Sequence, residues 1–173
     1  MIRFRHILFL ILILPGACVE VPDFSSTPFI SYNSVVFKDE SPIDYIYLTI
    51  NFKDGDGDLG LSNSDILSSP FTEFIDSAGV QVSNPNHYNI YPFLFRKNGD
   101  KYDSVLVSYR GIFPRLRDDG RKGPIEGTIE YKLGSFNFFG EDNSIAKIKV
   151  YIKDRKLNKS NVIETPPFPV YYE

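Results

Sequence analysis

The chain has 173 residues, with 19 lysines and arginines against 22 aspartates and glutamates, and a net charge of −3. This length is enough for one domain with its own hydrophobic core. The acidic balance argues against a nucleic-acid-binding surface, and the single cysteine excludes a disulfide within the chain. Core packing, strand hydrogen bonds and any bound metal must therefore hold the fold.

The beginning of the chain combines a short basic end, an apolar run and a cysteine. Arg3 and Arg5 precede an apolar run, Ile7 to Leu14, which is too short to span a bilayer. Small residues then lead into Cys18, and this arrangement resembles the lipobox of bacterial lipoproteins, with Pro15 where leucine is usual. In that class of proteins the signal peptide is removed before the cysteine, which is then acylated.

From this resemblance we expect residues 1–17 to be a signal peptide and Cys18 to carry palmitate or similar acyl chains. Two or three chains anchor a protein stably, and we expect the outer membrane as the location, on its periplasmic or cell-surface face. A plain secretory signal with a leftover thiol is the alternative. Residues 18–27 are polar and contain proline, so they are expected to tether the lipid to a domain at 28–173.

The clearest predicted strand runs from Ile43 to Phe52, and apolar and polar residues alternate along it from Tyr45. Its expected core face consists of Ile46, Leu48, Ile50 and Phe52. Residues 63–67 are expected to form one helical turn, and Asn98-Gly99 the central pair of a type I′ hairpin turn. Similar short runs between turn signals predict further strands at 34–37, 71–75, 80–82, 88–96, 101–107, 126–133, 145–152, 162–163 and 168–172.

The arrangement of these segments indicates the fold class. No segment carries a convincing helical period over ten or more residues. About seven short strands separated by turns are typical of an all-β, immunoglobulin-like antiparallel β-sandwich. A β-barrel is the competing architecture.

An acidic loop follows the clearest strand directly. Asp54, Asp56 and Asp58 alternate with glycines, and like charges at this spacing repel each other by several kcal/mol. A hard cation with oxygen ligands, above all Ca²⁺, would neutralise them. An EF-hand is excluded because its loop requires glycine where Leu59 stands and helices on both sides. The alternative is a solvated turn without metal.

The fold prediction places a second polar loop beside the first. In an immunoglobulin-like sandwich the loops after strands 45–52 and 145–152 emerge at the same end. Asp154, Asn158 and Asn161 would then lie near the three aspartates, while Lys53 and Arg155 are possible ion-pair partners for the acids without metal. The predicted calcium ligands are Asp54, Asp56, Asp58, Asp154 and Asn158.

Three sequence patterns together resemble small uncharacterised lipoproteins of the Bacteroidota type. They are the Phe-Lys-Asp-Gly-Asp-Gly-Asp-Leu-Gly run at 52–60, the Gly-x-Ile-x-Tyr pattern at 127–131, and the stretch from Val150 to Thr165. The resemblance covers most of the chain after Cys18. It implies a secreted, lipid-anchored, immunoglobulin-like domain and brings no established biochemical activity.

The functional expectation is a non-catalytic structural or binding module of the cell envelope, stabilised by calcium. After signal removal His87 is the only histidine, and it stands in an Asn-Pro-Asn-His turn with no serine elbow nearby. The alternatives are a carbohydrate-binding accessory lipoprotein of a glycan-uptake system and an unrecognised hydrolase. Tyrosines that offer sugar-stacking surfaces, or else cross-strand pairs, are Tyr45, Tyr47, Tyr88 and Tyr91.

A basic loop at 110–124 is a further candidate for a protein or glycan ligand. It contains Arg110, Arg115, Arg117, Arg121 and Lys122. Two aspartates in the same loop favour the simpler interpretation of a solvated loop. The sequence does not identify a ligand for it.

Overall fold

The computed structural model of the chain describes residues 22–40, 43–134 and 144–170. The predicted signal peptide at 1–17 and the predicted lipidation site, Cys18, lie outside the described residues. So does the end of the predicted last strand, at 171–172.

Strands dominate the described chain, with a single four-residue helix. The elements in order are β1 (Phe29–Glu40), β2 (Ile43–Asp54), α1 (Asn63–Ile66), β3 (Phe74–Ser77), β4 (Val80–Ser83), β5 (Ile90–Asn98), β6 (Lys101–Ser104), β7 (Ile125–Gly134), β8 (Ser144–Ile152), β9 (Ile163–Glu164) and β10 (Phe168–Val170).

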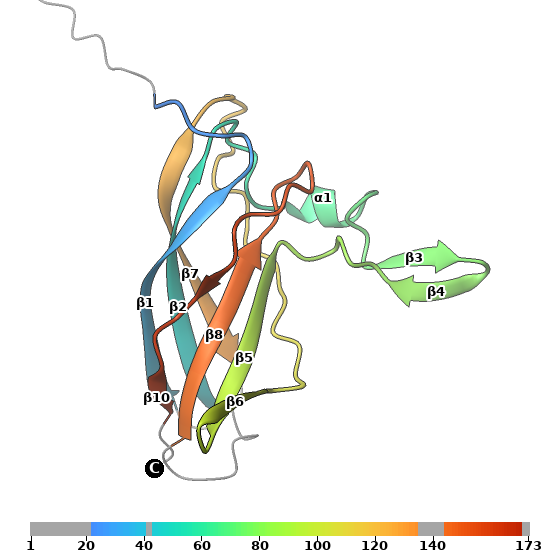
Figure 1. Cartoon of the computed structure of the whole chain (residues 1–173). Helices are drawn as coiled ribbons and strands as arrows, with labels where there is room; N and C mark the ends of the chain where they lie inside the picture. The colour runs from blue at the N-terminus through green and yellow to red at the C-terminus, as the bar shows by residue number, and fades with distance from the viewer. Residues whose placement is uncertain (1–21, 41–42, 135–143, 171–173) are drawn as a thin grey trace, which may run out of the picture.

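Two antiparallel sheets face each other as the layers of a sandwich (Figure 1). One has the strand order β1-β2-β7, and the other has the order β10-β8-β5-β6 with β9 also pairing with β8. This is the strand arrangement of an immunoglobulin-like sandwich, so the predicted fold class is confirmed. The β3-β4 hairpin forms a separate two-stranded sheet that projects sideways from the sandwich (Figure 1).

The core lies between the two sheets and follows the predicted alternation. On β2 the side chains of Ile46, Leu48 and Ile50 are fully buried, and on β8 every second residue from Ala146 to Ile152 is fully buried. Each buried aliphatic side chain contributes about 1.5–3 kcal/mol relative to exposure. Alternation therefore specifies both the strands and the face that they bury.

Several strand boundaries differ from the prediction, and those of β1 and β6 bear on the site and the groove described below. β1 begins at Phe29 rather than at residue 34, and a register shift between Tyr32 and Ser34 breaks its alternation. β6 ends at Ser104 rather than at residue 107. After it, the N–H of Val105 donates to the Leu94 carbonyl oxygen at 2.9 Å. The chain then leaves the edge of β5 and pairs with it again at Gly111, opposite Ile90.

The predicted turn at Asn98-Gly99 is displaced by one residue. Asn98 pairs with Lys101, so Gly99 and Asp100 are the central residues of the turn. Only Gly99 has a positive φ, +59°, which is the pattern of a type II′ turn rather than type I′. In the β3-β4 hairpin, both central residues have positive φ.

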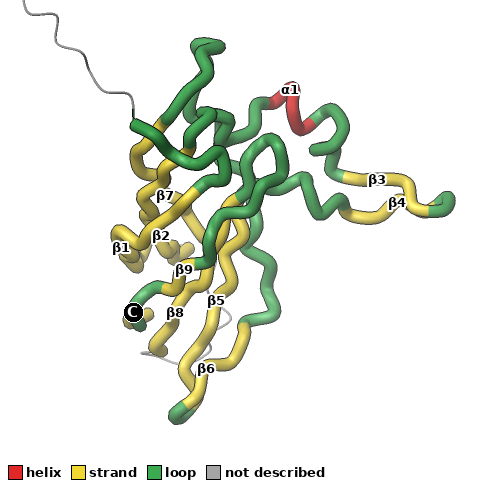
Figure 2. Tube along the Cα trace, turned by 45° about the horizontal axis from the view of Figure 1, so that its top comes forward, coloured by secondary structure: helices red, strands yellow, loops and turns green. Residues whose placement is uncertain are grey.

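The loops that follow β2 and β8 gather at one end of the sandwich, together with the segment that precedes β1 (Figure 2). The 110–124 loop also reaches this end, where its residues Leu116 and Gly123 donate backbone hydrogen bonds to the loop after β2. We refer to it as the loop pole. The candidate site is built there.

Candidate metal centre

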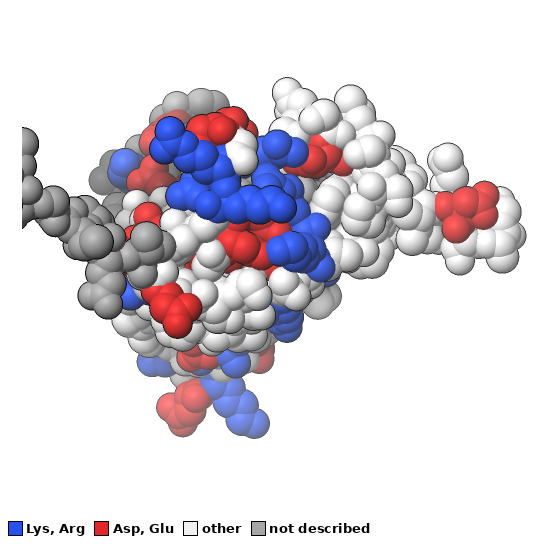
Figure 3. All heavy atoms as spheres, turned by 90° about the horizontal axis from the view of Figure 1, so that it is seen from above, with Lys and Arg blue, Asp and Glu red and all other residues white. Residues whose placement is uncertain are grey.

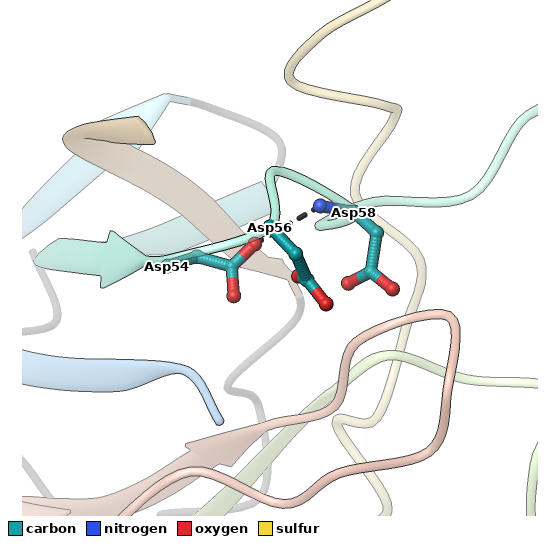
Figure 4. Close-up of side chains that lie close together, drawn as sticks. All are labelled: Asp54, Asp56 and Asp58. Atoms are coloured by element: carbon teal, nitrogen blue, oxygen red, sulfur yellow. Dashed lines mark hydrogen bonds between the residues drawn. The ribbon is translucent and has the colours of Figure 1, made fainter. Parts of the chain in front are cut away.

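Asp54 is the last residue of β2, where it pairs with Ile125 of β7, and it is fully buried. Its Oδ2 accepts the backbone N–H of Asp58 at 3.0 Å. This contact bends the chain back on itself. The carboxylates of Asp54, Asp56 and Asp58 consequently point to the same side, toward the loop between β8 and β9 (Figure 4).

The glycines between the aspartates are required by close packing. A Cβ on Gly55 would lie 2.1 Å from the Phe24 carbonyl oxygen, and one on Gly57 would lie 2.6 Å from the Gly123 carbonyl oxygen. Gly57 also has a φ of +71°, which side-chain-bearing residues rarely adopt. The alternation of aspartate and glycine thus lets neighbouring segments press against the loop while the acids stay on one side.

The second polar loop meets the first through the backbone. Asp154 organises this loop: its Oδ1 accepts the N–H groups of Lys156 (2.9 Å) and Asn158 (2.8 Å), and its Oδ2 accepts the Asn158 side-chain amide at 2.8 Å. The N–H of Arg155 donates to the carbonyl oxygen of Asp58 at 3.3 Å. The two loops therefore lie together at one end of the sandwich. Asp154 and Asn158 form hydrogen bonds with each other. A role for them as metal ligands therefore stays a prediction.

Three carboxylate oxygens at this site have no hydrogen-bond partner within the described part of the chain. They are the Oδ1 atoms of Asp54, Asp56 and Asp58, and all three are buried. The ligand atoms that the three residues offer lie within 4.8 Å of one another. Ca²⁺ binds oxygen at 2.3–2.6 Å, so opposite ligands of one ion stand about 5 Å apart. This buried cluster has the dimensions to hold a single metal ion.

The site is electrostatically strained without a cation. Burial, reinforced by the neighbouring carboxylates, raises the pKa of Asp54 and the pKa of Asp58 from 3.8 to about 6 each. The ammonium of Lys156 contacts Asp56 Oδ2 and lies 3.7 Å from Asp58 Oδ2. Figure 3 looks onto the loop pole and shows an acidic patch bordered by lysines and arginines. The exposed Lys156 is the cation in contact with the acids, and the charge of Arg155 also favours the ionised form of Asp58.

Two arginines singled out from the sequence have structural partners. Asp65, which accepts the N–H of Ser62 in the capping box of α1, also accepts two hydrogen bonds from Arg115, at 2.7 and 2.9 Å. This pairing holds the pKa of the Asp65 carboxyl well below its usual range. Arg117 donates to the carbonyl oxygens of Gly123 and Pro124 at 3.0 and 3.1 Å. Much of the 110–124 loop is therefore ordered by its own arginines.

Asn161 and Lys53 have partners outside the acidic cluster. Asn161 bridges to β1, accepting the N–H of Ile30 and donating to its carbonyl oxygen, both at 2.8 Å. Lys53 lies 3.8 Å from Glu126 rather than beside the aspartates. Sequence patterns did not predict these long-range contacts, since the partners are distant in the chain.

No protein-family model matches the sequence, and a search of curated proteins finds no match. Within the described residues, no helix has the length and apolarity needed to cross a membrane. The site must therefore be interpreted from its own geometry.

Proposed function

We propose that this chain is a lipid-anchored, non-catalytic module of the cell envelope, whose loop pole is stabilised by Ca²⁺. The observation that carries the calcium assignment is the convergence of three buried, unpartnered carboxylate oxygens from Asp54, Asp56 and Asp58. A buried polar atom without a partner costs free energy, and more so when it carries charge. A hard cation removes this cost at all three oxygens together.

Lys156 does not account for the arrangement by itself. Its ammonium contacts Asp56 and Asp58 at their Oδ2 atoms, from a side chain that is 61% exposed. The Oδ1 atoms stay buried without partners. Ca²⁺ takes six to eight oxygen ligands, so the aspartates would supply part of the set, with backbone carbonyls and water as the usual remainder. Bound calcium would supply charge neutralisation and crosslink the turns of the loop.

The non-catalytic role is supported by what surrounds the histidine. Nδ1 of His87 lies 2.8 Å from the carbonyl oxygen of Phe71. That contact occupies one ring nitrogen in a structural hydrogen bond. The Asp154 carboxylate is likewise committed to organising its own loop. Neither group is arranged as a general base beside a nucleophile.

The membrane anchor rests on the export signal, the cysteine at position 18 and the resemblance to Bacteroidota lipoproteins. The segment that follows the cysteine joins the domain at the loop pole, where the Ser25 carbonyl oxygen accepts the Gly55 N–H at 2.8 Å. An acylated Cys18 would therefore hold the calcium-binding end of the module close to the lipid. We take the outer membrane as its location, on either face.

Thermal unfolding of the purified full chain tests the calcium assignment. We expect Ca²⁺ at 100 times its Kd to add about 2.7 kcal/mol to the free energy of unfolding relative to excess chelator. Asp56→Ala should remove most of this gain, whereas Asp100→Ala, in the exposed β5-β6 turn, should retain it. Identical unfolding curves in calcium and in chelator would overturn the metal assignment.

Metabolic labelling tests the anchor separately. Cells that express the wild-type chain should incorporate radiolabelled palmitate into it, and the protein should fractionate with outer membranes. Cys18→Ala should abolish the label. Persistent labelling of that variant, or recovery of the wild type only from the soluble periplasm, would contradict the anchor.

A further inference from the structure

A groove of about 460 Å³ lies on the outer side of the β5-β8 sheet, away from the sandwich core. It forms where the chain leaves the edge of β5 after β6, so that residues 104–108 and Arg110 face β5 across a gap. Tyr151 and Lys153, at the end of β8, complete the lining. Its volume falls within the range of small-molecule sites in proteins, about 300–1,000 Å³.

One wall of this groove is a fixed aromatic platform. Tyr91 and Tyr151 are cross-strand partners whose rings stack with centroids 4.6 Å apart and planes 10° apart. Phe93 extends the stack, 6.0 Å from Tyr151, and is 48% exposed. The Tyr91 hydroxyl lies within hydrogen-bond distance of the carbonyl oxygens of Pro85 and Tyr88, at 2.8 and 2.5 Å, and its single proton is shared between them. The platform is therefore held in place before any ligand arrives.

The other notable property of the groove is its charge. Arg110 and Lys153 line it, and Lys159 lies over the Tyr151 ring, 4.0 Å from the centroid. The lining contains no acidic residue, and none of these three cations forms an ion pair with another described residue. Burial and the neighbouring Lys159 lower the pKa of Lys153, as expected where cations gather without an anion. In a chain with a net charge of −3, this is a local positive site.

We propose that this groove binds a short acidic glycan, with the apolar face of a pyranose ring on the exposed ring of Phe93 and its carboxylate or sulfate on Arg110 and Lys153. The C–H groups of a sugar face suit the electron-rich face of an aromatic ring. The planar guanidinium of Arg110 matches a carboxylate or sulfate through paired N–H donors. Three cations around one pocket do not make the continuous basic track that single-stranded nucleic acid requires.

This inference gives the envelope module a ligand but does not depend on the calcium site. The groove shares no residue with the acidic cluster. The sugar titration and the thermal unfolding in calcium therefore test two separate assignments, and either assignment can be wrong while the other holds. Loss of the calcium effect would leave the groove assignment untouched, and the reverse also holds.

Isothermal titration of the purified full chain with defined oligosaccharides tests the proposal. The probes are tetragalacturonate, which carries carboxylates alone, a chondroitin sulfate tetrasaccharide, which adds sulfates, and neutral maltotetraose. We expect at least one acidic probe to bind at least about tenfold more tightly than the neutral one, since a charge-assisted pair adds that much. The stronger of the two acidic probes identifies the anionic group.

Two groove variants and one control make the result specific. Arg110→Gln should weaken the acidic probe about tenfold, because the guanidinium contact is lost. Phe93→Ala should weaken it by a similar factor through loss of stacking. Arg121→Gln, at an exposed arginine of the 110–124 loop, should bind as the wild type does. Thermal melts of both variants should match that of the wild type, because Phe93 and Arg110 are exposed.

Three results would overturn the proposal. They are the absence of binding by both acidic probes, equal binding of maltotetraose, and unchanged affinity in both groove variants. Tighter binding of an oligothymidylate than of either acidic sugar would assign the platform to single-stranded nucleic acid and overturn it as well.

Discussion

The most informative perturbation of the acidic cluster is Asp54→Asn. Asp54 is fully buried, and its pKa is raised from 3.8 to about 6. Above that pH its charge therefore destabilises the calcium-free protein. Asparagine keeps the shape and an oxygen that can accept the Asp58 N–H, but it removes the charge. The substitution should stabilise the protein in chelator and weaken the gain from calcium.

The expected size follows from the pKa shift. Raising the pKa of Asp54 from 3.8 to about 6 lowers the free energy of unfolding of the calcium-free protein by about 3 kcal/mol at pH 7.5. The weaker hydrogen bond of a neutral amide reduces this gain, so we expect about 1–3 kcal/mol in chelator. For a chain of this size, 1 kcal/mol shifts the melting temperature by about 2–4 °C. In saturating calcium the order should reverse, because the variant has lost a charged ligand.

The assay is differential scanning calorimetry of wild type and variant, each in calcium and in excess chelator at pH 7.5. Asp100→Asn is the matched control, since it makes the same change at an exposed carboxylate in the β5-β6 turn. We expect the variant to melt at a higher temperature than the wild type in chelator and at a lower temperature in calcium. If Asp54→Asn lowers the melting temperature equally in both buffers, the carboxylate has a purely structural role and the reasoning is wrong.

Three further predictions concern stability. Because the pKa values of Asp54 and Asp58 are raised, the folded state binds more protons than the unfolded state between about pH 4 and 6. In chelator, the free energy of unfolding measured by urea titration should therefore increase when the pH is lowered from 7.5 to 5. The stabilisation by calcium should disappear over the same range. Arg115→Ala should cost about 2 kcal/mol, and because the pKa of Asp65 is lowered, this loss should be full above about pH 4 and shrink below it. Asn161→Ala breaks two hydrogen bonds to Ile30, and urea unfolding should show a loss of about 2 kcal/mol.

The strands were predictable because alternation is a local property of the sequence. On β2 and β8 the buried face follows directly from every second apolar residue. The turn at Gly99 was displaced by one residue because Asn-Gly fits more than one register, and the pairing of Asn98 with Lys101 decides between them. The start of β1 escaped prediction because its alternation is interrupted by a register shift and several of its side chains are only partly buried.

The meeting of the two polar loops followed from topology, since the two strands that precede them, β2 and β8, end at the same pole of an immunoglobulin-like sandwich. Individual contacts did not follow. Nothing local marks Asp65 as the partner of Arg115, fifty residues away, or Asn161 as a partner of Ile30. The groove beside Tyr91 also depends on where β6 ends. The side-chain pattern predicts this end at residue 107, three residues after Ser104. Such features arise from tertiary geometry, which pattern analysis of one sequence does not contain.

The packing of the N-terminal segment links the anchor to the acidic loop. Gly55 has no room for a side chain because the Phe24 carbonyl oxygen lies against it, and its N–H is bound by Ser25. Ordering of the aspartates by calcium would therefore also order the point where the chain leaves the domain (Figure 1). A lipid on Cys18 would then hold the loop pole toward the membrane. The groove on the outer side of the β5-β8 sheet would then open to the side of the domain rather than toward the membrane, where a glycan could enter it.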